Sequence, residues 1–203
     1  IALMTPPTDL ALDIRIHSKA PPGAGTGTSA AVTVALLGAL DALTPGRMTP
    51  HEVAAAAQRV ETEMLGRQCG IQDQLASAYG GINFIEMFRY PQATVTRIDA
   101  PDATLWELER RLVLVYLGRS HDSSAVHESV IHALENAGPD SPPIVELRRT
   151  AALSRGALLA GDFTGLGRAM IENAEAQARL HPALIGSEAR HVIDIAKAHG
   201  ALG

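Results

Sequence analysis

Residues 21–31, PPGAGTGTSAA, join a glycine-rich turn to the start of a predicted helix. Gly23, Gly25 and Gly27 occupy alternate positions, and glycine lets the backbone turn sharply and bring N–H groups close to a ligand. An alanine-rich apolar run follows as far as Leu43, which predicts a helix that begins near Thr28. The free N–H groups and the positive dipole end of that helix would face the loop. The stretch therefore predicts an anion-binding cradle.

The glycine spacing excludes two common phosphate-binding motifs. A P-loop requires a Lys that is absent here, and the dinucleotide fingerprint has a G-x-G-x-x-G spacing instead of G-x-G-x-G. Thr28 and Ser29 lie at the expected helix start, where a hydroxyl can cap the helix, contact phosphate or bind a metal. On spacing alone, a flexible glycine turn with a Ser/Thr cap is the alternative interpretation.

The residues before the loop alternate between apolar and polar. Leu12, Ile14 and Ile16 are separated by Asp13 and Arg15, and this pattern predicts a half-buried strand at 12–17. Strand, glycine loop and helix would then follow one another directly.

The rest of the chain shows further helix and strand signals. Thr49-Pro50-His51-Glu52 is a capping box with Pro in the first turn, so a helix is predicted from there to about Leu65. The next predicted elements are a helix at 72–79, a hairpin with arms 82–89 and 94–98, and a buried strand at 112–117. Helices are predicted from 123 onward, with breaks at 138–139, 161–162 and 181–182. The last predicted helix covers 187–199. A soft boundary is expected near Pro101.

Two carboxylates flank a second glycine-containing loop. Glu61 lies late in one predicted helix and Asp73 at the start of the next, so the loop from Gly66 to Gly70 could bring both to one cleft. Phosphoryl transfer uses a carboxylate to hold Mg²⁺ and often another to orient the attacking hydroxyl. The alternative is an ordinary pair, one on a helix surface and one capping a helix, because acidic residues are usually solvated.

Composition limits the possible functions. The 203 residues are 46% hydrophobic but 3% aromatic, which predicts an aliphatic, alanine-rich core. The net charge of −5 and the lack of a basic block argue against nucleic acid as a partner. No apolar run is long enough for a membrane span. Cys69 is the single cysteine, which favours a cytoplasmic location.

Residues 21–31 resemble the central ATP-binding motif of the GHMP kinases, whose usual form is Pro-x-Gly-x-Gly-Leu-Gly-Ser-Ser-Ala. Thr26 replaces the Leu, and Thr28 replaces the first Ser with its hydroxyl kept. In that family the loop wraps the nucleotide phosphates, and the second hydroxyl, here Ser29, helps to hold magnesium. The resemblance implies a cofactor-binding set of Pro22, Gly23, Ala24, Gly25, Thr26, Gly27, Thr28 and Ser29.

Residues 66–74, GRQCGIQDQ, resemble the galactokinase segment that contains the catalytic aspartate. The resemblance implies that Asp73 is catalytic and that Glu61 joins Ser29 at the metal. Glu63 is the neighbouring alternative for the metal role. Cys69 is expected to be a packing residue, since no base accompanies it.

Two further segments resemble the heptose 7-phosphate kinase branch of the family, 73–86 and 112–120. Within the second, Arg119 is a candidate phosphate contact, with a surface Arg at a strand end as the equal alternative. His121 and His127 are expected to be polar surface residues, and Tyr116 partly buried.

The resemblance implies an α+β fold of the two-part GHMP kind, incomplete at both ends. Its parts would be a ribosomal-protein-S5-like N-terminal part at 1–100 and a ferredoxin-like, helix-rich C-terminal part at 101–203. The implied cofactors are ATP and Mg²⁺, and the implied partner is a small-molecule sugar phosphate. The implied activity is phosphorylation of a sugar-phosphate hydroxyl, best matched by the anomeric hydroxyl of a heptose 7-phosphate. Galactose, fucose or homoserine as substrate, or a catalytically silent sugar- and nucleotide-binding sensor, are the alternatives; the sequence does not indicate an oligomeric state.

Overall fold

The computed structural model describes residues 4, 7, 9–21, 23–44, 46–118, 123–135, 138 and 140–203, without the side chains of 123–125 and 127. The chain forms two compact units. The first comprises Ile1–Arg97 with Gly118–Ala125, and the second Ile98–Leu117 with Val126–Gly203. Each unit is described by itself.

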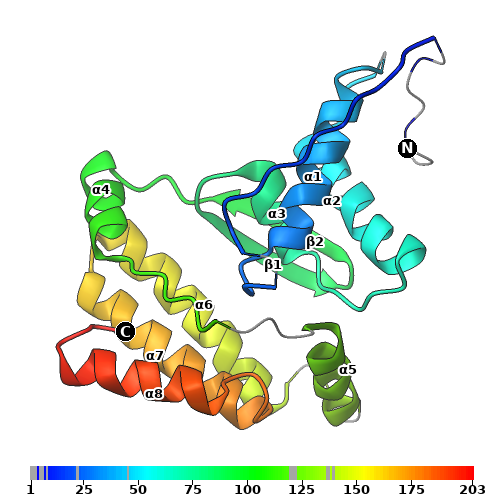
Figure 1. Ribbon diagram of the computed structural model, residues 1–203. Helices are drawn as coiled ribbons and strands as arrows, with labels where there is room; N and C mark the ends of the chain where they lie inside the picture. Colours follow the sequence, from blue (N-terminus) through cyan, green and yellow to red (C-terminus); the bar gives the residue numbers. More distant parts are fainter. Residues whose placement is uncertain are drawn as a thin grey trace. The chain divides into compact units, whose positions relative to one another are not determined.

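The first unit packs three helices and a hairpin together (Figure 1). Its elements are α1 (Thr28–Asp41), α2 (Pro50–Arg59), the π-helical turn η1 (Val60–Met64), α3 (Gln72–Tyr79), β1 (Asn83–Arg89) and β2 (Gln92–Arg97). The three helices and the hairpin predicted for this region are confirmed. With helices and an antiparallel sheet, the fold is of mixed α and β content, as expected for an α+β protein.

Local capping explains where α2 begins. The Thr49 hydroxyl accepts a hydrogen bond from the Glu52 N–H at 3.3 Å, and the Thr49 N–H donates to Glu52 Oε2 at 2.7 Å. Both halves of the predicted capping box are therefore formed. The helix does not end as a regular α-helix. It widens into the π turn η1, a feature often found at functional sites, and this turn contains Glu61.

Two apolar clusters form the core of the first unit. One joins α1 and α2 through Val34, Leu37, Leu40, Val53 and Ala57, with Met4 packed against them. The other joins α2, α3 and β2 through Ala54, Ile71, Leu75 and Ala93. Ala54 and Ala57 are both completely buried, which allows α2 to approach its neighbours closely. This aliphatic core agrees with the low aromatic content of the chain.

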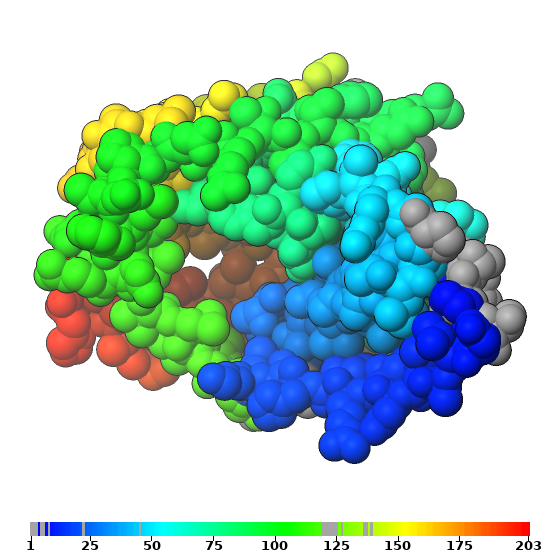
Figure 2. Space-filling model, turned by 90° about the horizontal axis from the view of Figure 1, so that it is seen from above, coloured from blue at the N-terminus to red at the C-terminus, as the bar shows by residue number. Residues whose placement is uncertain are grey.

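The predicted strand at 12–17 is wrong. These residues run beside α1 without regular secondary structure, and Leu12, Ile14 and Ile16 are 39–61% exposed. Figure 2 shows this segment in dark blue on the surface of the first unit. A strand needs a hydrogen-bonding neighbour, and within the described residues the strands pair only with each other as β1 and β2. The alternating pattern alone does not supply that neighbour.

The second unit consists mainly of helices. They are α4 (Asp102–Arg111), α5 (Ser123–Leu134, which begins at the edge of the first unit), α6 (Pro142–Ala160), α7 (Phe163–Leu180) and α8 (Ser187–Ala198). The predicted break at 161–162 is confirmed: Gly161 is left-handed, with φ of 66°, and the Asp162 side chain caps α7 by accepting from the Gly165 N–H. The break at 181–182 is confirmed as a gap between α7 and α8, and Gly138 likewise lies outside any helix, while Pro139 is outside the described residues. Helix α4 had no predicted counterpart.

A buried polar contact fixes how α6 and α7 pack. Thr150 is completely buried, and its hydroxyl accepts from Asn173 Nδ2 at 2.9 Å. Asn173 Oδ1 in turn accepts from Gln177 Nε2 at 2.7 Å. Because unpaired buried polar groups are costly, this chain of contacts specifies one alignment of the two helices.

The predicted buried strand at 112–117 is also wrong. All six residues are exposed, from 43% at Leu117 to 83% at Leu114, and they have no regular secondary structure. Tyr116, expected to be partly buried, is 49% exposed. A strand that is apolar on both faces needs neighbouring strands in a sheet and other elements that cover both faces of that sheet. No strand is present among the described residues of the second unit.

None of the described helices combines the length and the apolar character needed to cross a lipid bilayer.

Candidate active site in the first unit

The glycine loop has an unusual backbone. Gly23, Gly25 and Gly27 all adopt the left-handed conformation, with φ of 69°, 71° and 67°. Side chains disfavour this region, so the three alternating glycines are required by the path of the chain. Pro22, the first residue of the predicted binding set, lies outside the described residues, as do Arg119 and His121.

The loop ends at the exposed start of α1. Gly27 is the N-cap residue, and no side chain caps the helix or adds a negative charge to its first turn. The N–H groups of that turn are therefore left for another acceptor, as an anion site requires. Thr26 Oγ1 and Thr28 Oγ1 lie 3.1 Å apart, and Ser29 is exposed beside them. The predicted helix start at Thr28 is confirmed.

Asp73 lies directly against this loop. A Cβ atom added to Gly27 would be 3.1 Å from Asp73 Cγ and 3.3 Å from Asp73 Oδ2. Asp73 belongs to the first turn of α3, whose N-cap is Ile71 and has no side-chain cap. The carboxylate is therefore not the N-cap of this helix. The packing of α3 on α1 instead places it beside the candidate phosphate loop.

Glu61 is a buried carboxylate. It is 5% exposed, and Oε1 accepts a hydrogen bond from Gln74 Nε2 at 3.3 Å. Among the described ion pairs, none involves Glu61 or Asp73. Buried carboxylates are normally paired with a cation or bound to a metal. The environment of Glu61 therefore fits the metal role that the sequence predicts for it.

The neighbouring alternative, Glu63, has a different environment. Its side chain is 59% exposed and forms an ion pair with Arg59 at 3.1 Å, one turn earlier on the helix. Both Glu63 oxygens accept from Arg59 Nε at 3.2 Å. Glu63 is therefore a solvated surface carboxylate, which leaves Glu61 as the better candidate.

Tyr90, in the turn between β1 and β2, holds the loop between Glu61 and Asp73 in place. The Tyr90 hydroxyl donates to the Cys69 carbonyl oxygen at 3.0 Å and accepts from Gln58 Nε2 at 2.6 Å. Burial raises the pKa of Tyr90, which keeps the hydroxyl protonated as a donor. Neither Tyr90 nor Gln58 was singled out by sequence analysis, because they come from separate elements without a shared motif.

The Cys69 side chain lies near both carboxylates. Burial, first, and then the negative charge of Glu61 raise the pKa of its thiol; Asp73 adds a smaller effect in the same direction. A thiol that stays protonated is a poor nucleophile. This environment agrees with the expected packing role of Cys69.

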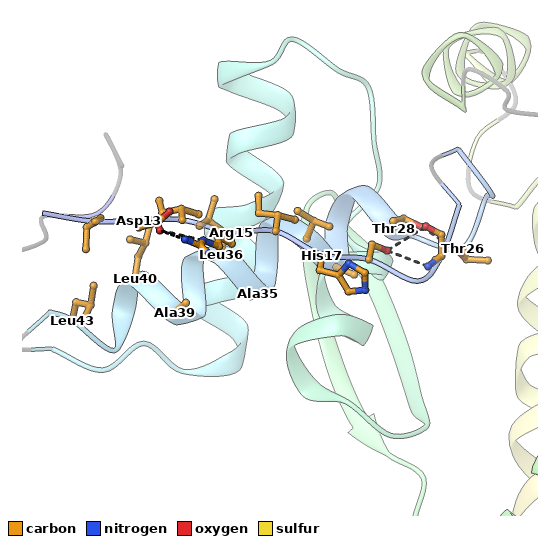
Figure 3. Close-up of a pocket in the computed structure, with 17 residues that line it drawn as sticks. Asp13, Arg15, His17, Thr26, Thr28, Ala35, Leu36, Ala39, Leu40 and Leu43 are labelled. Carbon is orange, nitrogen blue, oxygen red and sulfur yellow. Dashed lines mark hydrogen bonds and ion pairs between the residues drawn. The ribbon is translucent and has the colours of Figure 1, made fainter.

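A cavity of about 600 Å³ lies beside α1 (Figure 3). Its walls are the segment at 12–18 and one face of α1, including Leu36 and Leu40, with Leu43 just after the helix. Thr26 and Thr28 of the glycine loop line it as well. The α1 wall is apolar, and the polar groups come from the two threonines and from Asp13, Arg15 and His17 of the segment beside it.

No group of three or more described His, Cys, Asp or Glu side chains forms a ready metal cage. No described hydrogen bond joins Ser29 to Glu61 either. The structure does bring two pairs together, Asp73 with Gly27 and Glu61 with Gln74. Because Asp73 and Gln74 are consecutive, the first turn of α3 links the glycine loop to the buried carboxylate.

Comparison with known proteins gives one family match. Residues 3–81 match the family described as "GHMP kinases N terminal domain". This part of the chain is therefore similar to the N-terminal domain of the GHMP kinases. The matched range includes the glycine loop, Glu61 and Asp73, so every predicted site residue lies within it.

Individual relatives agree with this result. The chain is similar to a mevalonate kinase of Methanothermobacter thermautotrophicus, 44% identical over 78 residues, which is 38% of this chain and 25% of that protein. A D-glycero-alpha-D-manno-heptose 7-phosphate kinase of Campylobacter jejuni is 29% identical over 119 residues, 59% of this chain and 35% of that protein. A galactokinase of a Roseiflexus species is 40% identical over 68 residues, 34% of this chain and 17% of that protein. The matches thus span about a third of these relatives or less.

Proposed function

We propose that this protein is an ATP- and Mg²⁺-dependent kinase that phosphorylates a hydroxyl of a sugar phosphate. The observation that supports it best is the contact between Asp73 and Gly27, which sets a carboxylate beside an uncapped helix N-terminus. Phosphoryl transfer depends mainly on positioning and electrostatics. A phosphate loop with an adjacent carboxylate provides both.

In the proposed mechanism each element has one role. The N–H groups of residues 23–29 and of the first turn of α1 bind the nucleotide phosphates. Asp73 orients the attacking hydroxyl and accepts its proton. Ser29 and Glu61 would hold Mg²⁺, and the ion would neutralise negative charge on the phosphate oxygens. Cys69 and Tyr90 take no chemical part; they fix the loop between the carboxylates.

For the substrate, we propose a heptose 7-phosphate phosphorylated at its anomeric hydroxyl. The similarity to the heptose 7-phosphate kinase extends over 59% of the chain, beyond the GHMP N-terminal domain, while the more identical mevalonate kinase match covers 38%. That mevalonate kinase match makes another small alcohol the second candidate. Galactose, fucose and homoserine, or a silent sensor, are further alternatives.

The two-part arrangement is proposed in the same way. Residues 1–100 would be the N-terminal part and 101–203 a ferredoxin-like, helix-rich C-terminal part, in a cytoplasmic enzyme.

The test is a substrate panel. The complete gene product, with MgATP, would be assayed against heptose 7-phosphate, mevalonate, galactose, fucose and homoserine, with ADP release and product identity as readouts. We expect the highest kcat/KM with heptose 7-phosphate. A preference for mevalonate or galactose would refute the substrate and keep the kinase. Tight MgATP binding without turnover on any substrate would favour the sensor.

A further inference from the structure

Gln74 is buried beside the proposed metal carboxylate. It is 2% exposed and is among the largest fully buried side chains of the described residues. Its Nε2 donates to Glu61 Oε1 at 3.3 Å and reaches Cys69 Sγ at 3.8 Å. Its Oε1 is buried and has no hydrogen-bond partner among the described residues. Sequence analysis assigned Gln74 no role.

These contacts are unusual for a residue that serves packing alone. A buried amide oxygen without a donor costs free energy, so a folded protein rarely keeps one without a reason. A leucine of similar size would fill the space without that cost. The amide is useful at this position because its N–H fixes one oxygen of Glu61 and leaves the other oxygen for a different ligand.

We propose that Gln74 is a positioning residue that orients Glu61 for the metal, an inference that rests on the proposed function. Metal-binding carboxylates are typically held by hydrogen bonds from neighbouring groups. Mg²⁺ also keeps several of its waters when bound in proteins. Gln74 Oε1, which has no hydrogen-bond partner among the described residues, would accept a hydrogen bond from such a water.

The chain offers a matched comparison in Gln58. It is also a buried glutamine, 5% exposed, and its Nε2 donates to the Tyr90 hydroxyl and not to a carboxylate. A change of Gln58 to Met therefore removes a buried amide of the same size, while Tyr90 still donates to the Cys69 carbonyl oxygen and Gln74 still donates to Glu61. Any effect of buried-amide loss in general is expected in both variants. An effect on the metal is expected only at Gln74.

The experiment measures Mn²⁺ binding, with Mn²⁺ in place of Mg²⁺, by electron paramagnetic resonance on the complete protein with ADP. Gln74→Met is expected to weaken Mn²⁺ binding by about 10–100-fold, the usual effect of removing a hydrogen bond to a metal ligand. The Mn²⁺ affinity of Gln58→Met is expected to stay within about twofold of that of the parent protein. If Gln74→Met does not fold, Gln74→Asn keeps the amide but shortens it, and the same weakening is expected.

A double-mutant cycle identifies how Gln74 acts. In a Glu61→Gln background, Gln74→Met should have no further effect on Mn²⁺ binding, since its effect passes through Glu61. Unchanged Mn²⁺ affinity in a folded Gln74 variant, or equal additive losses in both backgrounds, would overturn this assignment while leaving the kinase intact. A parent protein that binds neither nucleotide nor Mn²⁺ would instead overturn the proposed function and, with it, this inference.

Discussion

The Asp73 carboxyl packs against Gly27 so closely that a methyl group on Gly27 would lie 3.1 Å from Asp73 Cγ. Gly27 therefore meets two requirements. It adopts a left-handed backbone as the N-cap of α1, and it leaves room for the carboxylate. The relationship connects two motifs that are 46 residues apart in the printed sequence, and it is the geometric basis of the candidate site.

Substitution of Gly27 tests this contact. Gly27→Ala is expected to lose about 1–2 kcal/mol of stability from the left-handed backbone and, in addition, to displace Asp73 and lower turnover. Gly161→Ala is the matched control, because Gly161 has nearly the same left-handed backbone, with φ of 66° and ψ of 21°, and an added Cβ there would meet only Thr104 Oγ1, at 3.4 Å. Chemical denaturation and steady-state kinetics would be measured for both. Equal kinetic losses in the two variants would mean that backbone strain, and not the Asp73 contact, is responsible.

Asp73→Asn separates a chemical role from a structural one. The amide keeps the size of the side chain, and Asp73 is exposed and is not the helix N-cap, so stability should be nearly unchanged. The amide cannot accept the proton of the attacking hydroxyl. Turnover should fall by about two or more orders of magnitude, the scale for loss of a general base, while nucleotide affinity by calorimetry is retained. Turnover within a few-fold of the parent would remove Asp73 from the mechanism.

Helices of the first unit could be predicted because their signals are local. The Thr49–Glu52 capping box and the glycine run before Thr28 depend on neighbours in sequence, and both appear where the pattern places them. The strands at 12–17 and 112–117 could not be predicted reliably. Their alternation or apolar run describes a surface suited to a sheet, but the partner strand is a property of the whole fold.

Family resemblance proposed the residues of the candidate site but not their contacts. Family resemblance identified Glu61 and Asp73, but it gave Glu61 and Glu63 nearly the same sequence context. Only burial separates them, since Glu61 is 5% exposed and Glu63 forms a surface ion pair with Arg59. Gln74 belongs to the segment 66–74 that carries the resemblance, but it was given no role, because its relation to Glu61 depends on how α3 packs beside η1.

The difference between the two glutamates gives a further prediction. Glu61→Gln and Ser29→Ala should each raise the Mg²⁺ concentration that gives half-maximal activity, because each removes a proposed metal ligand. Glu63→Gln is the control; it removes a carboxylate two residues away that is already paired with Arg59, and it should leave the Mg²⁺ requirement unaltered. Activity would be titrated with Mg²⁺ at constant total ATP. A shift with Glu63→Gln but not with Glu61→Gln would exchange their assigned roles.

The contact between Tyr90 of the hairpin turn and the loop between Glu61 and Asp73 gives the last prediction. Tyr90→Phe removes the hydroxyl that donates to the Cys69 carbonyl oxygen and accepts from buried Gln58. Leaving a buried donor without a partner is expected to cost about 1–3 kcal/mol. Because the loop between Glu61 and Asp73 loses an anchor, kcat should also fall several-fold with little change in nucleotide affinity.

Tyr79→Phe is the control, since its hydroxyl makes one longer contact, 3.4 Å to His51 Nδ1. Thermal unfolding and kcat would be compared. If Tyr90→Phe loses stability but keeps full kcat, the contact stabilises the unit without positioning the loop.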